Sequence, residues 1–196
     1  MMAAAQQDTQ QKIIVMGASR GGLAAIRHVL ESLQPGFAAS VLIALHPKLD
    51  SARTRIADWR GWTRLPIRYA EHGAQILPGE IYLTPPHQLL EVRDDLTLSL
   101  IPVSNESPSE HWADRLFITA AHVYGDRTIG VILTGGDSDG AQGMKAIHAA
   151  GGTGIVQEPS DALDPSMPLS SLRIDHPDYC VPLRDIADLL NTLAHQ

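Results

Sequence analysis

The sequence predicts an α/β fold, built as one domain around a mainly parallel, doubly wound sheet with helices on both faces. Two observations carry this prediction. Short apolar runs punctuated by glycine or proline alternate along the chain with segments of helical periodicity, the pattern of repeated strand–helix–strand units. Such units close with right-handed crossovers, which make neighbouring strands parallel. A hairpin pattern near the middle of the chain adds an antiparallel element at one edge.

The first half of the chain begins with a buried-strand pattern. The run KIIVMG (12–17) is followed by GLAAIRHVLESL, in which Leu23, Ile26, Leu30 and Leu33 fall at helical spacing. SVLIALH is a second apolar run and SARTRIADWRGW a second helix. Two short strands are expected next, over 65–71 and 79–85. The hairpin follows, with arms over 89–93 and 96–102 and a turn at two adjacent aspartates.

The second half repeats the alternation. A helical stripe is expected over 109–125, and TIGVILTGG (128–136) is the most strand-like run of the chain. A helix over 138–151 is closed by Gly151, because glycine readily takes the left-handed conformation that ends helices. A strand over 152–158 and a terminal helix over 183–196 complete the order.

Composition restricts the class of protein. A formal net charge of -7 argues against nucleic acid as a partner, and no apolar stretch is long enough for membrane insertion. The lone cysteine, Cys180, excludes an internal disulfide framework and is expected to be a small buried hydrophobe; a cytoplasmic protein is the expectation. Residues 1–11 read as a disordered leader and 12–196 as the catalytic domain. The histidine spacings predict no metal site, and no cofactor is expected.

The segment GASRGG (17–22) raises the question of a catalytic serine. Gly17 to Gly21 match G-x-S-x-G, the sharp strand-to-helix turn that exposes a nucleophilic serine, here Ser19. A glycine-rich turn made only for packing reads the same way. The segment is also similar to the opening of the short-chain dehydrogenases, but Ala24 replaces their third glycine, and no tyrosine is followed by lysine four positions later.

A nucleophilic serine needs a base and a carboxylate that orients the base. His46 directly follows the second apolar run, and so is expected at the same rim of the sheet as Ser19. Asp137 and Asp139 follow the strand-like run TIGVILTGG, in a glycine-rich loop. Asp139 also precedes a helix, so capping that helix is its alternative role.

Together these segments resemble the chemotaxis protein-glutamate methylesterases of the CheB type. The family's Gly-Ala-Ser-Thr-Gly-Gly turn reads GASRGG here, its Gln-His-Met segment reads LHP, and its Thr-Gly-Met-Gly-x-Asp-Gly-Ala loop reads TGGDSDGA. The likeness continues through ILPGEIYLTPPHQLL, SPSEHWADRLFITAA and DPSMPLSSL. Family proteins carry a receiver domain ahead of this one, so the resemblance implies a stand-alone catalytic domain that a separate receiver-domain regulator could serve.

The resemblance implies a Ser19–His46–Asp139 triad that hydrolyses glutamyl methyl esters on chemoreceptor helices and deamidates certain glutamines. The flanking residues differ from the family pattern. Arg20 replaces a threonine, Leu45 and Pro47 flank the histidine, and Gly136 and Asp137 replace Met-Gly in the loop expected to stabilise the oxyanion. We expect Arg20 and Asp137 to form an ion pair across the site.

Two other functions fit the same residues. One is a catalytically weak domain of this fold that binds a receptor or signalling partner. The other is a serine esterase of the same fold with a different ester or amide substrate. Retention of all three triad residues favours an enzyme, because a binding domain needs none of their chemistry.

Overall fold

The structure, a computed structural model, describes residues 11–45, 56–103 and 111–195. Its centre is a seven-stranded sheet in the order β3-β4-β2-β1-β7-β8-β9, in which every neighbouring pair is parallel. These strands are β1 (Ile13–Ala18), β2 (Ser40–Leu45), β3 (Ile67–Tyr69), β4 (Ile81–Leu83), β7 (Thr128–Ile132), β8 (Thr153–Gln157) and β9 (Tyr179–Val181).

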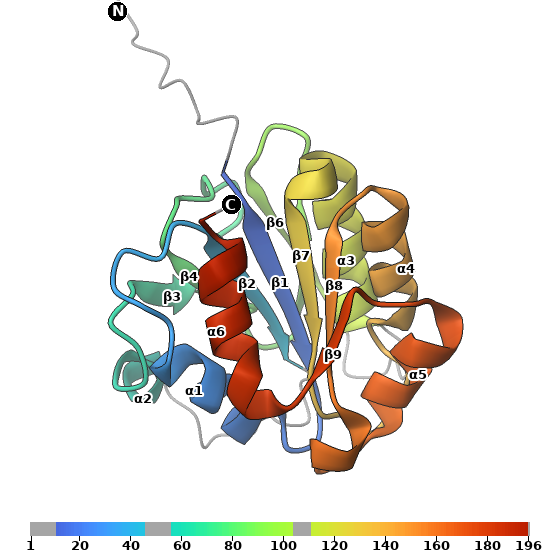
Figure 1. The fold of residues 1–196 in the computed structure, drawn as a ribbon. Coiled ribbons are helices and arrows are strands. Elements are labelled where there is room, and N and C mark those ends of the chain that lie inside the picture. The colour runs from blue at the N-terminus through green and yellow to red at the C-terminus, as the bar shows by residue number, and fades with distance from the viewer. Residues whose placement is uncertain (1–10, 46–55, 104–110, 196) are drawn as a thin grey trace, which may run out of the picture.

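Helices cover both faces of this sheet, which confirms the predicted doubly wound α/β class (Figure 1). One face packs against α1, α2 and α6, and the other packs against α3 and α4. The bounds are α1 (Gly22–Glu31), α2 (Ile56–Arg60), α3 (Trp112–Tyr124), α4 (Ala141–Ala149), α5 (Ser166–Ile174) and α6 (Leu183–Leu193), with short 3-10 helices η2 (Gly125–Arg127) and η3 (Pro159–Asp161).

Strand β1 shows why the sheet needs both helix layers. Successive side chains of a strand point to opposite faces, and those of β1 alternate between two buried clusters. Ile14 and Met16 belong to the cluster with α1 and α6, whereas Ile13 and Val15 belong to the cluster with α3. A strand apolar on both faces can only lie in the interior of a covered parallel sheet.

The predicted hairpin is present as β5 (Gln88–Val92) and β6 (Leu98–Pro102), which pair antiparallel. It forms a two-stranded sheet of its own, and not the antiparallel edge of the seven-stranded sheet that the sequence predicted. Its apolar side chains join the cluster under α3, so the hairpin packs on the helix layer of one face. The isolated bridge between Gln75 and Thr97 ties its turn to the chain before β4.

Two elements near the C-terminus were not expected from the sequence, namely α5 and β9. Pro168 lies in the first turn of α5, where a missing N–H costs little, so the apparent breaker does not prevent a helix. β9 has only three residues and lies at the edge of the sheet. The expectation that Cys180 is buried was wrong, because its position in this edge strand leaves the thiol exposed.

The strand order places one site-forming feature at the middle of the sheet. From β1 the chain moves to β2 and β4 on one side, and later returns to β7 on the other. The carboxyl ends of β1 and β7 therefore flank a topological switch point, where open α/β sheets bind their ligands. The turn at Ser19 follows β1, and the loop at Asp139 follows β7.

Candidate active site

Ser19 lies in a tight turn between β1 and α1, as its motif predicts. Its carbonyl accepts the N–H of Gly22 at 2.7 Å, which closes the turn, and its own N–H donates to the Thr134 carbonyl at 3.0 Å. Gly21 has φ +81°, a left-handed conformation that favours glycine. The serine is half-buried at the carboxyl end of the sheet, beside the N-terminus of a helix.

The loop after β7 approaches Ser19 closely because it contains Gly135. A Cβ at Gly135 would lie 1.9 Å from the Met167 Sδ and 3.0 Å from the Ser19 Cβ. No side chain fits between those two neighbours. Glycine at this position therefore brings the β7 loop and the serine turn into contact.

Asp139 lies on this loop, is buried to 8% exposure, and caps the start of α3. Its Oδ2 accepts the N–H of Ala113 at 2.8 Å and its Oδ1 accepts the N–H of Asp114 at 2.9 Å. Both donors belong to the first turn of α3, whereas α4, the helix that follows Asp139 in the chain, begins after Gly140 without a side-chain cap. The alternative role of Asp139, capping the helix that follows it, is therefore not seen.

The environment of Asp139 raises the pKa of its carboxyl. Burial raises the pKa of the Asp139 carboxyl above its ordinary value, the N–H groups of Ala113 and Asp114 act in the opposite direction, and the nearby Asp114 and Asp137 carboxylates add to the rise. Two backbone donors also fix the position of the carboxylate. A fixed, buried carboxylate is what an orienting residue in a triad requires.

His46 lies outside the described residues. The strand that leads to it is described up to Leu45, which pairs with Ala18, the residue before Ser19. The last described pair of β1 and β2 thus consists of the residues that immediately precede Ser19 and His46 in the chain.

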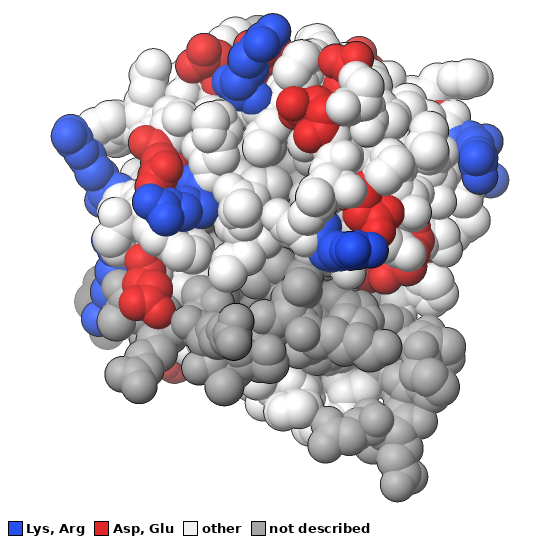
Figure 2. All heavy atoms as spheres, turned by 90° about the horizontal axis from the view of Figure 1, so that it is seen from below, with Lys and Arg blue, Asp and Glu red and all other residues white. Residues whose placement is uncertain are grey.

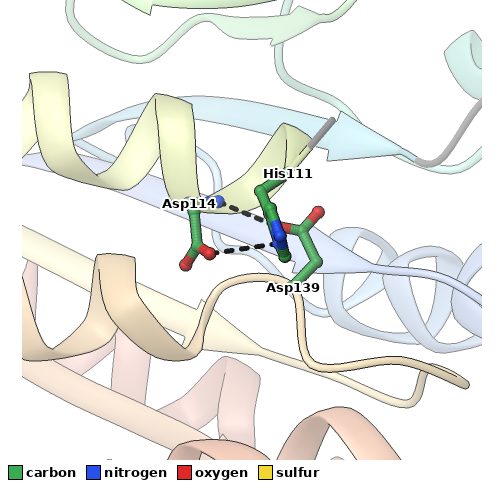
Figure 3. A group of neighbouring side chains, drawn as sticks. All are labelled: His111, Asp114 and Asp139. Atoms are coloured by element: carbon green, nitrogen blue, oxygen red, sulfur yellow. Dashed lines mark hydrogen bonds and ion pairs between the residues drawn. The ribbon is translucent and has the colours of Figure 1, made fainter. Parts of the chain in front are cut away.

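A histidine that the sequence did not single out contacts the Asp139 carboxylate (Figure 3). The Nδ1 atom of His111 lies 3.8 Å from the Asp139 Oδ1 and 3.3 Å from the Asp114 Oδ2. His111 is the residue before α3 and Asp114 lies three positions later, a spacing that brings two side chains together at a helix start. That spacing is the signal that sequence reasoning missed.

His111, Asp114 and Asp139 also form a group that could hold a metal ion. Each offers one ligand atom, and these atoms lie within 4.8 Å of one another. The two carboxylates have a structural role without an ion. Asp139 accepts the two N–H groups at the start of α3. The Asp114 Oδ1 accepts the N–H of Gly143 at 2.7 Å. That bond links the start of α3 to α4.

The expected ion pair between Arg20 and Asp137 is not formed, and this prediction was wrong. The Arg20 Nη1 lies 3.8 Å from the Asp164 Oδ2, on the loop between η3 and α5. Asp137 instead accepts the N–H of Asp139 at 2.9 Å through its Oδ1, a local turn that holds the loop. A Cβ at Gly136 would lie 3.0 Å from the same Asp164 oxygen, so Asp164 lies between Arg20 of the serine turn and the loop after β7.

Thr134 joins these loops and was not recognised from the sequence. Its Oγ1 accepts the N–H of Asp164 at 2.8 Å and lies 2.9 Å from the Arg20 carbonyl and 3.2 Å from the Asp164 carbonyl, to one of which it donates. Its N–H donates to the Gln157 side chain at 2.9 Å. One buried threonine therefore holds the serine turn and the Asp164 loop together.

A helix that crosses a bilayer needs about 20 consecutive, mostly apolar residues. Within residues 11–45, 56–103 and 111–195, no helix has both the length and the apolar character needed to cross a membrane.

These features define a parallel α/β protein in which a strand-end serine turn contacts the loop that carries a buried carboxylate, at the switch point of the sheet, and serine hydrolases use residues of these types. The family model for CheB methylesterase matches residues 14–190. A putative protein-glutamate methylesterase/protein-glutamine glutaminase of Leptospira interrogans is 37% identical over 178 residues, covering 90% of this chain and 91% of that protein.

A second relative is protein-glutamate methylesterase/protein-glutamine glutaminase 3 of Burkholderia lata, 34% identical over 180 residues, of which the match spans 49%. Among solved structures, the Thermotoga maritima CheB methylesterase catalytic domain superposes with a TM-score of 0.81 at 26% identity, over 93% of this chain and 98% of that one. The chain belongs to the CheB methylesterase family, whose members are carboxylic ester hydrolases.

Proposed function

We propose that this protein hydrolyses glutamyl methyl esters on chemoreceptor cytoplasmic helices, releasing methanol, and that it also converts certain glutamines to glutamate. The observation that carries this proposal is the contact between the Ser19 turn and the loop of Gly135 and Asp139 at the β1/β7 switch point. The names of the relatives, protein-glutamate methylesterase and protein-glutamine glutaminase, supply the substrate class.

The proposed reaction proceeds through an acyl-enzyme. The Ser19 Oγ attacks the γ-carbonyl carbon of the ester while His46 takes the hydroxyl proton, and Asp139 holds the imidazole in the correct tautomer. His46 then returns the proton to the departing methoxide, so methanol leaves. Water, activated by the same histidine, attacks the acyl-enzyme and releases the glutamate side chain and free Ser19.

A helix terminus and one backbone N–H are proposed to stabilise the tetrahedral intermediate. The N-terminus of α1 follows Ser19 and favours negative charge there. The N–H of Gly136 has no acceptor among the described residues, which supports a role as an oxyanion donor. An N–H of this kind is typically worth about 10²–10³ in rate.

Two further proposals concern the setting of the reaction. We infer that the protein acts in the cytoplasm, where receptor helices would be reached, and that a separate receiver-domain protein regulates access. Mixing the protein with such a regulator should change the rate of methanol release if that inference holds, and an unchanged rate would exclude it.

The test is methanol release from receptor membranes that carry radiolabelled methyl esters. Release should disappear in Ser19→Ala and persist in Ser99→Ala, a matched control because Ser99 is also half-buried but lies in the separate β5–β6 hairpin. A fluorophosphonate probe should label the wild type and not Ser19→Ala. Labelling without methanol release would favour an esterase with another substrate, and absence of both would favour a binding domain.

A further inference from the structure

An exposed leucine lies against the serine turn. Leu163 is 74% exposed, and the next most exposed large apolar side chain of the described residues is at 45%. A Cβ at Gly21 would lie 2.8 Å from the Leu163 Cδ2. Leu163 therefore rests on the backbone two residues from Ser19. A single exposed leucine is ordinary on a protein surface, so its position beside the nucleophile is what requires explanation.

The loop that carries Leu163 is fixed from both sides. Gly135 donates its N–H to the Asp164 carbonyl at 3.0 Å, and Asp164 donates its N–H to the Thr134 Oγ1 at 2.8 Å. Further along, Met167 donates its N–H to the Gly135 carbonyl at 2.9 Å. An exposed apolar side chain on a fixed loop loses little conformational freedom when a partner covers it, so that contact contributes most of its burial to binding.

A cation lies beside the same serine. Arg20 follows Ser19 directly, and its side chain is 76% exposed. Only its Nη1 lies near Asp164, at 3.8 Å, and Asp164 is itself held ionised because hydrogen bonds from Ser166 lower the pKa of its carboxyl. An arginine has five N–H donors, and an exposed pair at this distance is weak. The guanidinium can therefore take a second carboxylate.

The remaining surface gives this arginine significance. The protein has a formal net charge of -7, which opposes the approach of an acidic partner. Figure 2 shows the face on which the strands end, and among the described residues there the basic side chains are scattered between acidic ones. Arg20, which directly follows the proposed nucleophile and is exposed, is a local positive charge that can attract a carboxylate to the site.

We propose that Leu163 and Arg20 select the protein segment that carries the ester, by binding one apolar and one acidic side chain that flank the modified glutamate. This inference rests on the proposed function and adds the sequence of its substrate. Neighbouring Cα atoms are about 3.8 Å apart, so Ser19, Arg20 and Gly21 span a distance comparable to one helical turn. Side chains three or four positions apart on a helix lie on one face, about 5–6 Å from each other, and match that spacing.

The test uses helical peptides with a central glutamate γ-methyl ester. On the helix face that carries the ester, the position three or four residues to one side of the ester is Glu or Lys. The position three or four residues to its other side is Leu or Ala. Both arrangements along the peptide are made. The measured quantity is the ratio of kcat/KM between two peptides for one enzyme, which cancels any general change in Ser19 reactivity.

In one of the two orders, the wild type should prefer Glu over Lys by about two- to fivefold, as expected for one exposed ion pair. Arg20→Glu should reverse that preference. The wild type should also prefer Leu over Ala by about tenfold, and Leu163→Ala should abolish this preference. Leu77→Ala is the matched control, because Leu77 is also exposed but its carbonyl binds Ser40 at the start of β2, the end of the sheet away from the site.

Equal kcat/KM values for all peptides in the wild type would overturn this inference alone. The same follows if Arg20→Glu and Leu163→Ala keep the wild-type preferences. If the wild type hydrolyses no ester peptide and takes up no fluorophosphonate, the proposed function fails and the inference falls with it, so the two failures are distinguishable.

Discussion

Asp139 caps the start of α3 and is proposed to orient the catalytic base, and substitution can separate these two roles. The carboxylate accepts the N–H groups of Ala113 and Asp114 while buried, and it is proposed to orient His46. Asp139→Ala removes both the acceptor oxygens and the charge. Asp139→Asn keeps the size of the side chain and one acceptor oxygen, but removes the charge.

The expected losses of stability follow from the hydrogen bonds. A buried donor left without an acceptor costs about 1–3 kcal/mol, and loss of a helix N-cap costs about 0.5–2 kcal/mol. Asp139→Ala leaves two donors at the start of α3, so we expect a loss of about 2–4 kcal/mol in the free energy of unfolding. Asp139→Asn leaves one donor and should cost about 1–2 kcal/mol.

The assay is urea denaturation followed by far-UV circular dichroism, combined with fluorophosphonate labelling of Ser19. Asp139→Asn should stay folded at room temperature, yet its labelling rate should fall by roughly 10²–10⁴ because the base loses its orienting charge. If the free energy of unfolding of Asp139→Ala is within about 0.5 kcal/mol of the wild-type value, the capping argument is refuted. If Asp139→Asn labels at the wild-type rate, the carboxylate is not the orienter.

The pH dependence of stability gives an independent check on the same residue. Burial raises the pKa of Asp139 in the folded protein, so between the ordinary aspartate pKa and this raised value the folded state binds more protons than the unfolded chain. The stability contributed by Asp139 is therefore complete below the ordinary pKa and decreases as the pH rises through the folded one. Relative to Asp139→Asn, the wild type should lose stability with rising pH over that window, and a constant difference would contradict the raised pKa.

Three further predictions concern the neighbours of the site. Thr134→Val should lower the free energy of unfolding by about 1–3 kcal/mol in urea, because the Asp164 N–H loses its acceptor, whereas Thr134→Ser should retain most of it; equal losses would contradict the role of the hydroxyl. Gly135→Ala should slow fluorophosphonate labelling, because its Cβ overlaps the Met167 side chain, and Met167→Ala in the same protein should restore part of the rate; no rescue would show another cause. Cys180 should react with a maleimide in the folded protein, because its side chain is exposed. The pH at which this reaction becomes fast should be higher than for a free thiol, because partial burial raises the pKa of the Cys180 thiol. Protection of Cys180 until the protein unfolds would show that the thiol is buried.

Most of the fold could be predicted because its signals are local. The apolar runs of β1, β2 and β7 and the helical periodicity of α1 and α6 are contained in single segments of sequence, and alternation of the two kinds of segment dictates parallel crossovers. α5 and β9 were not predicted, because they have no such local signal. Their formation depends on packing against α4 and β8 rather than on a pattern of their own.

The site divides along the same line. Ser19 could be found because a glycine-rich turn after a strand has a recognisable motif. The partners of charged residues could not, since Arg20 contacts Asp164, 144 positions along the chain by the difference of their numbers. The sequence offered Asp137 as a nearer acidic candidate, but proximity in sequence does not measure proximity in space. The family comparison identifies the chain as a whole, and only the coordinates show that Asp139 caps α3.

The position of Thr134, Gly135 and Asp139 on one loop connects the proposed catalytic residues with the proposed recognition residues. Thr134 and Gly135 hold the Leu163–Asp164 loop, Gly135 contacts Ser19, and Asp139 closes the start of α3. A change of sequence in this loop would therefore alter the nucleophile, its proposed orienter and the proposed recognition residues together. By contrast, Leu163 has its side chain largely in solvent and can change without loss of these hydrogen bonds, since they use only the backbone and side chains of its neighbours. Substrate preference in this protein should therefore be adjustable at Leu163 at a small cost in stability, whereas adjustment through the β7 loop should reduce stability and reactivity together.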